Sequence, residues 1–238
     1  DEPPAREWQG VLLANEVLDA LAVERFRQGE NGVEQMCVTP GESGDPGWEF
    51  RPAPEELVQA VDHIATDTGR EFPTGYRSEV NLQLVPWLNS VTATMNRGLA
   101  LFIDYGYPRS EYYLPERSDG TLMCHYRHRA HDDVFFWPGL QDITAWVDFT
   151  ALAEAADACG LDVEGYASQT MFLLACGLDQ LLMNHSENSD DGGAALSAEA
   201  RQLTLPGMMG EKFQVMGLGR GLDKPLRGFS LQDLRHRL

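Results

Sequence analysis

Short apolar runs that end in amide or acidic side chains are the most regular pattern in this chain. Residues 10–14 read Gly-Val-Leu-Leu-Ala and precede Asn15 and Glu16, while residues 99–103 read Leu-Ala-Leu-Phe-Ile and precede Asp104. An unbroken apolar run of this length predicts a strand buried on both faces, as in a parallel sheet covered by helices. Ligands of open α/β sheets bind outside the carboxyl ends of such strands. The pattern therefore predicts an α/β fold with a polar ligand-binding edge.

Helical spacing of apolar residues predicts the segments between and after these strands. Pro54 suits the first turn of one helix, Pro86 predicts a kink or restart within another, and Asp148 is a plausible cap for a third. A fourth helix should be interrupted near Gly177. The predicted helices cover residues 54–65, 78–95, 149–159 and 170–183, and further strands are predicted at 33–38, 48–51, 162–167 and 213–218.

A chain of 238 residues is long enough for one full domain with insertions. Turn-rich residues 40–47 separate two of the predicted strands and indicate an inserted hairpin. We expect insertions near 28–52 and 107–140, and a mobile loop at the polar segment 186–195. The fold class is thus α/β, with inserted hairpins and helices.

Composition and charge restrict the possible partners. The hydrophobic content of 43% and charged content of 23% are those of an ordinary globular protein. The formal net charge of −19 repels nucleic-acid backbones and anionic membranes, so we expect neither as a partner. No apolar run is long enough for a transmembrane helix. An acidic surface favours a basic protein segment, although it is also compatible with simple solvation.

Four cysteines lie far apart without a C-x-x-C pair, which predicts reduced thiols in a cytosolic type of compartment. Three histidines at positions 125, 128 and 131 match no established metal-binding spacing, so we expect no metal site there. The glycine-rich residues 217–221 follow a predicted strand, but Pro225 comes too soon for a dinucleotide-binding helix. We expect a turn at 217–221 rather than a cofactor site.

The residues around the first strand end carry the most specific chemistry. A carboxylate at Glu16 or Asp19 is able to pair with a guanidinium or accept a hydrogen bond from an amine. Alternatively, these side chains only favour the first turn of a following helix. Asp104 and Tyr105 at the second strand end are open to the same two interpretations, contact with a ligand or a local structural role. Spacing alone does not decide between the two readings.

Taken in order, five blocks of the sequence resemble the mitochondrial dysgenesis protein A family, the complex I assembly factor type of class I methyltransferase. The resemblance runs from about residue 10 to residue 229, nearly the whole chain. It implies a Rossmann-like sheet that uses S-adenosylmethionine, and transfer of a methyl group to protein arginine. The blocks are residues 15–21, 76–81, 102–107, 142–149 and 209–213.

This resemblance implies a role for each candidate residue. Glu16 would fix the arginine guanidinium and polarise its charge, and Asn15 would orient the reacting nitrogen and contact the cofactor. The remaining candidates would bind substrate. They are Asp19, Asp104, Tyr105, Asp142 and Thr144.

The family carries its glycine-rich cofactor loop upstream of the Asn15-Glu16 block, and no such loop precedes residue 10 here. We therefore expect this chain to be the C-terminal part of one methyltransferase domain, inactive alone. Two alternatives stay open: a non-enzymatic scaffold that grips a basic client, and a small-molecule methyltransferase. The resemblance fits the bacterial cytoplasm or the mitochondrial matrix, and a homodimer is possible.

Overall fold

The computed structural model describes residues 3–41, 44–127, 129–188, 194–205 and 207–238. The chain divides into two compact units, each built from separate segments. Unit 1 comprises Asp1–Val17, Val85–Gly106 and Phe149–Leu238, and unit 2 comprises Leu18–Leu84 and Tyr107–Asp148. This division does not decide where insertions begin and end, so the boundaries 28–52 and 107–140 stay predictions.

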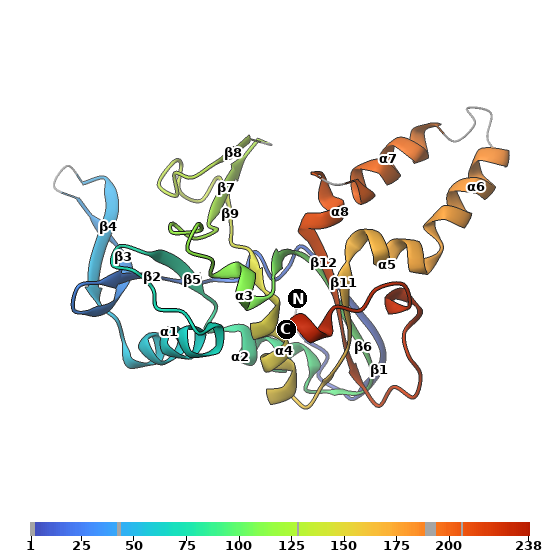
Figure 1. The fold of residues 1–238 in the computed structure, drawn as a ribbon, viewed down its shortest axis with the longest axis horizontal. Coiled ribbons are helices and arrows are strands. Elements are labelled where there is room, and N and C mark those ends of the chain that lie inside the picture. Colours follow the sequence, from blue (N-terminus) through green and yellow to red (C-terminus); the bar gives the residue numbers. More distant parts are fainter. Residues whose placement is uncertain (1–2, 42–43, 128, 189–193, 206) are drawn as a thin grey trace. The chain divides into compact units, whose positions relative to one another are not determined.

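A mixed sheet forms the centre of unit 1, with strand order β1-β6-β12-β11. The strands β1 and β6 run parallel and side by side, whereas β12 is antiparallel to both β6 and β11 (Figure 1). The α/β class predicted from the sequence is confirmed, with antiparallel strands added to the parallel pair. The bounds are β1 (Trp8–Asn15), β6 (Met95–Tyr107), β11 (Asp162–Ser168) and β12 (Phe213–Arg220).

The helices predicted at 149–159 and 170–183 are present in unit 1, whereas the helix predicted at 78–95 is shorter than expected and the helices at 194–204 and 209–212 were not predicted. The helix predicted for 78–95 begins only at Leu84, because Arg77–Val80 pairs with another strand and Pro86 is tolerated in a first helical turn. Gly177 ends one helix in the left-handed conformation, as predicted. The helices are α2 (Leu84–Thr92), α4 (Phe149–Ala158), α5 (Gln169–Cys176), α6 (Leu178–Asn188), α7 (Ala194–Thr204), α8 (Met209–Lys212), η1 (Arg227–Phe229) and η2 (Arg235–Arg237).

Half of the mobile loop predicted at 186–195, namely residues 189–193, lies outside the described residues. Its described ends belong to α6 and α7. The turn predicted at 217–221 is wrong for residues 217–220, which lie within β12. A Cβ atom at Gly217 would lie 3.0 Å from the ring of Phe229, so a side chain there would require the ring to shift.

Both faces of β6 are covered, whereas β1 is not. Phe102 contacts Trp87 of α2 on one face, and Leu101 packs against the cluster around Phe229 on the other. Val11 and Leu13 of β1 are 67% and 65% exposed. The prediction that residues 10–14 are buried on both faces is therefore wrong for this chain, because Val11 and Leu13 share one face of β1 and no described element covers that face.

Unit 2 contains two small antiparallel sheets and a long helix. Its first sheet has the order β4-β3-β2-β5, in which β3 and β4 form the predicted hairpin, and its second has the order β8-β7-β9. Helix α1 starts after Pro54 and ends at Gly69, which is left-handed. The elements are β2 (Glu24–Gly29), β3 (Gly32–Pro40), β4 (Pro46–Pro52), α1 (Glu55–Thr68), β5 (Arg77–Val80), α3 (Arg109–Tyr112), β7 (Met123–Tyr126), β8 (Arg129–His131), β9 (Asp142–Thr144) and β10 (Val147–Asp148).

None of the described helices is long and apolar enough to cross a membrane.

Buried tyrosines in the core of unit 2 should make the protein sensitive to alkaline pH. Burial raises the pKa of Tyr76 to about 12, and it also raises the pKa of Tyr112 and Tyr113. The folded protein thus holds these protons more tightly than the unfolded chain, whose tyrosines titrate near pH 10. The free energy of unfolding should therefore fall as the pH rises from about 10 to about 12. Denaturant titrations across this range test this, and Tyr76→Phe should reduce the slope; a flat profile would refute it.

Candidate active site

The carboxyl ends of β1 and β6 lie next to each other in unit 1. Asn15 is in register with Ile103, and the backbone N–H of Glu16 donates a hydrogen bond to the carbonyl oxygen of Ile103 (3.0 Å). Glu16 and Asp104 therefore follow paired positions at one edge of the sheet. The structure brings these two predicted residues together.

Glu16 is exposed and has an unusual backbone conformation. Its φ of 51° lies in the left-handed region, which costs a residue other than glycine about 1–2 kcal/mol. The amide Nδ2 of Asn15, also exposed, donates to Oε1 of Glu16 (3.2 Å). A strained residue that carries an exposed carboxylate at a strand end is typical of a functional site.

Asp104 is buried, with only 1% of its surface exposed. Its Oδ2 accepts a hydrogen bond from the backbone N–H of Val17 (3.2 Å), and its Oδ1 accepts one from that of Tyr105 (2.9 Å). This carboxylate thus holds the turn that contains Glu16. The contacts favour a positioning role for Asp104 over the direct substrate contact expected from the sequence.

The Asp104→Asn variant tests this positioning role. An amide has one acceptor oxygen, so the N–H of Val17 or of Tyr105 loses its acceptor, and the free energy of unfolding should drop by about 1–3 kcal/mol. The turn of Glu16 should then loosen, and kcat of the complete enzyme should fall at least about tenfold. Chemical denaturation and turnover assays measure both effects. Exposed Asp162→Asn is the control, and equal behaviour of the two variants would contradict the role.

Tyr105 is partly buried beside Asp104, and its ring meets that of Phe213 edge to face, with 5.4 Å between centroids. The four residues Asn15, Glu16, Asp104 and Tyr105 therefore form one cluster in unit 1.

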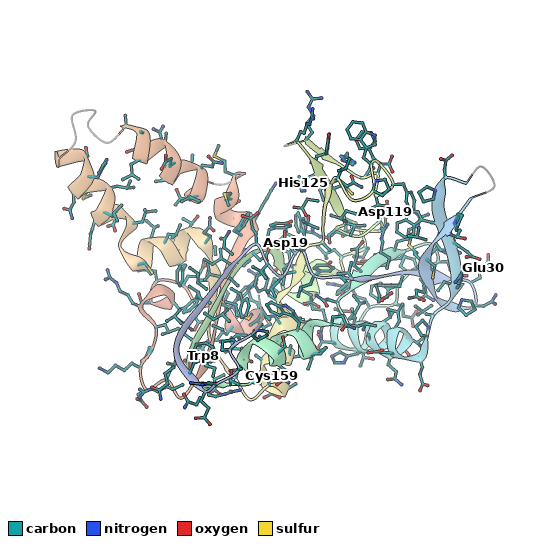
Figure 2. All side chains as sticks on the ribbon, turned by 180° about the vertical axis from the view of Figure 1, so that it is seen from behind. Trp8, Asp19, Glu30, Asp119, His125 and Cys159 are labelled. Atoms are coloured by element: carbon teal, nitrogen blue, oxygen red, sulfur yellow. The ribbon has the colours of Figure 1, made fainter. Side chains whose placement is uncertain are left out.

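The other predicted residues belong to unit 2. Asp19 is buried, and its carbonyl oxygen accepts from the N–H of Ala145 (2.9 Å), the residue that follows β9. Asp142 is exposed at the start of β9, opposite His125 of β7, which Figure 2 labels. Thr144 is buried, and its hydroxyl oxygen has no hydrogen-bond partner among the described residues. Asp19 is thus brought next to the segment that carries Asp142 and Thr144.

Unit 2 also contains a buried ion pair that we did not predict. Glu79 is fully buried, its Oε1 lies 3.1 Å from Nε of Arg25, and its Oε2 accepts from the N–H of Thr121 (2.9 Å). Burial raises the pKa of Glu79, and Arg25 opposes this shift. Glu79 lies within the block 76–81, but the helix predicted there obscured its position in a strand.

An apolar pocket of about 530 Å³ lies in unit 2 and was not predicted either. Residues from β2, β3, β4 and β9 line it, together with the segments 20–23 and 134–138. No single segment carries enough of this lining to be recognised in the sequence.

No group of three or more His, Cys, Asp or Glu residues suited to hold a metal ion occurs among the described residues. His125 and His131 lie on β7 and β8, and His128 lies outside the described part of the chain.

Comparison with known proteins gives matches to curated sequences. The chain is 30% identical over 211 residues to "Protein arginine methyltransferase NDUFAF7, mitochondrial" from Danio rerio, a match that covers 86% of this chain and 46% of that protein. It is 26% identical over 220 residues to the Mus musculus protein of the same name, covering 89% of this chain and 46% of that protein. The chain thus spans about half the length of these relatives.

Two solved structures from Burkholderia thailandensis are similar over essentially the whole chain. One was determined bound to S-adenosyl-homocysteine; it has a TM-score of 0.92 and 38% identity, covering 100% of this chain and 60% of that one. The second, a native structure, has a TM-score of 0.90 and 37% identity, covering 99% and 62%.

A family model matches residues 1–167, which is well over half of the chain. It carries the description "Putative S-adenosyl-L-methionine-dependent methyltransferase". The family resemblance drawn from the five sequence blocks is confirmed, and so is its cofactor. This chain belongs to that family of S-adenosylmethionine-dependent methyltransferases.

Proposed function

We propose that this chain is the substrate-binding part of a methyltransferase that transfers a methyl group from S-adenosylmethionine to an arginine guanidinium of a protein. One observation carries the proposal: exposed Glu16, held in a left-handed conformation, stands at the edge shared by β1 and β6. The name of the Danio rerio relative supports arginine as the acceptor.

The chemistry of arginine methylation needs a carboxylate in such a place. A guanidinium is protonated at neutral pH and is a poor nucleophile. Glu16 accepts hydrogen bonds from the guanidinium, localises its charge on the nitrogens it contacts and leaves the opposite nitrogen free to react. Asn15, hydrogen-bonded to Glu16, orients a substrate N–H through its amide oxygen. Asp104 keeps the turn in place.

The residues of this strand end also suit S-adenosylmethionine, which supplies a methyl group on a positively charged sulfur when bound. The exposed carboxylate of Glu16 has the charge that such a cation favours, and the amide of Asn15 both donates and accepts hydrogen bonds. We propose that the main cofactor site and the remaining strands of a Rossmann-like sheet belong to a part outside this chain. That part would cover Val11 and Leu13, which are exposed here.

The proposed substrate is a basic protein segment. The net charge of −19 attracts such a segment and disfavours nucleic acid. The carboxylates of exposed Glu16 and buried Asp104 lie at the same edge of the sheet. They add a local negative potential at the proposed site.

A radiolabel transfer assay tests this function. The complete protein, tritiated S-adenosylmethionine and a basic protein extract should yield labelled protein, and acid hydrolysis should release the label as methylarginine. Label recovered only in small molecules, or in another amino acid, would overturn the arginine assignment. A complete protein that binds S-adenosylmethionine but transfers no label would support a scaffold instead.

A further inference from the structure

The apolar pocket of unit 2 has aromatic and aliphatic walls. The rings of Trp48 on β4 and Phe135 face each other with centroids 5.2 Å apart, and Met36 is buried in β3. Val38 and Ile143 also line the pocket but are 60% and 41% exposed, which puts them at its opening. A volume of about 530 Å³ is within the usual range of pockets that bind small ligands.

The two charged side chains that line this pocket both have hydrogen-bond partners within the protein. Arg25 donates to the carboxylate of Glu79 (3.1 Å) and to the backbone carbonyl of Asp119 (2.8 Å), and its guanidinium lies 5.4 Å from the centroid of the Trp48 ring. Glu24 accepts a hydrogen bond from Nε2 of Gln35 (2.7 Å). Arg25 therefore offers no unpaired positive charge to an anionic occupant, and the lining residues other than Glu24, Arg25 and Thr144 are apolar, which favours an apolar occupant.

The first residue that lines the pocket, Ala20, follows the candidate catalytic residue Glu16 by four positions. Glu16 itself stands at the end of β1. Four residues span at most about 14 Å even when fully extended. Whatever the arrangement of the two units, covalent connection keeps the Cα atom of Ala20 within this distance of that of Glu16. A peptide of a few residues bridges such a distance.

We propose that this pocket binds an apolar side chain of the protein substrate, within a few residues of the arginine that is methylated. This inference rests on the proposed function and adds a specificity site to it. The acidic surface attracts a basic segment in general, whereas the pocket requires an apolar residue within a few residues of the arginine. Acidic residues outnumber basic ones in unit 2, which is consistent with an apolar anchor on an otherwise basic peptide.

Binding of amino acid amides to this chain tests the pocket without any enzymatic assay. N-acetyl-leucinamide should shift the methyl NMR signal of Met36 in a saturable way. Its dissociation constant should be at least tenfold lower than that of N-acetylglycinamide. Ala22→Trp fills the pocket from its exposed edge, and Ile143→Asp puts a charge at its opening; each should weaken binding at least tenfold. Equal binding by both amides, or by all variants, would overturn the proposal.

Leu140→Asp is the matched control, because Leu140 is 70% exposed in the same unit and does not line the pocket. This variant should bind N-acetyl-leucinamide within twofold of the unmodified chain, and thermal unfolding should show that all three variants fold. Light scattering tests whether a second copy of this chain occupies the pocket instead. A dimer that persists in Leu140→Asp and dissociates in Ile143→Asp would make the pocket a contact between copies, which overturns the proposal.

Methyl transfer by the complete enzyme then separates this inference from the proposed function. The substrates are peptides of glycine, serine and lysine with one central arginine. Each peptide carries a single leucine, placed at one of the five positions before or after the arginine. One leucine position should lower KM at least tenfold with little change in kcat, and Ile143→Asp should abolish that gain. Transfer to arginine that is indifferent to leucine would refute the pocket and leave the function intact. Amide binding without any transfer would refute the function and leave the pocket.

Discussion

Replacement of Glu16 by glutamine is expected to lower turnover of the complete methyltransferase at least about 100-fold, the low end for loss of a positioned acid or base. Glutamine keeps the size and shape of the side chain but removes the negative charge that fixes the guanidinium. Single-turnover transfer from tritiated S-adenosylmethionine measures the chemical step directly. The change should appear in kcat more than in KM, because the charge matters most as the guanidinium reacts.

A second substitution at the same position separates function from stability. Glu16→Gly removes the carboxylate and also relieves the strain of a left-handed backbone at φ 51°. This variant should be as inactive as Glu16→Gln, yet its free energy of unfolding should rise by up to about 1 kcal/mol. A protein that becomes more stable and less active retains its strained residue for function.

Glu30→Gln serves as the control, because Glu30, which Figure 2 labels, is exposed in the turn between β2 and β3 of unit 2 and does not belong to the cluster around Glu16. It should change neither turnover nor stability. Near-normal turnover of Glu16→Gln would remove Glu16 from the mechanism.

Replacement of Gly120 by alanine is expected to be the most destabilising single-methyl change in unit 2. A Cβ atom at Gly120 would lie 2.2 Å from the carboxylate of buried Glu79, and the φ of 80° disfavours any side chain. The carboxylate is fixed by Arg25 and by the N–H of Thr121, so it has no space to withdraw. We expect a loss of about 3 kcal/mol, comparable to disruption of a buried ion pair.

Gly139→Ala is the matched control for this change, because Gly139 has a φ of 82° but open space around its Cβ position. It should therefore show only the backbone penalty of about 1–2 kcal/mol. Chemical denaturation of both variants isolates the contact with Glu79. Equal losses would mean that the Glu79 carboxylate is less firmly held than its contacts indicate.

The sequence pattern predicted those elements whose apolar spacing has one explanation. The run at 99–103 and the segments at 162–167 and 213–218 are strands of the sheet, and the break at Gly177 follows from the conformational freedom of glycine. The paired strand ends at Glu16 and Asp104 also follow from two parallel strands.

Other features depend on neighbours that a local pattern does not contain. Residues 78–80 fit a helical spacing, but pairing with β2 makes them a strand. The apolar run at 10–14 predicts burial, yet burial depends on what covers the strand, and Val11 and Leu13 are exposed in this chain. The pocket of unit 2 is assembled from separate segments, so no single run of residues indicates it.

The candidate residues show the same division. The cluster around Glu16 could be predicted because two strand ends bring it together, whereas the separation of Asp19, Asp142 and Thr144 into another compact unit could not. Asp104 was expected to face substrate, but its hydrogen bonds to backbone N–H groups direct it to the turn. Spacing along a chain does not reveal which partner a carboxylate will choose.

A crystal structure of the complete protein with S-adenosyl-homocysteine and an arginine peptide tests the central claim most directly. We predict that a carboxylate oxygen of Glu16 lies about 3 Å from a guanidinium nitrogen, as a charge-assisted hydrogen bond requires. An arginine bound with its guanidinium beyond about 6 Å from Glu16, and held by other carboxylates, would contradict the claim.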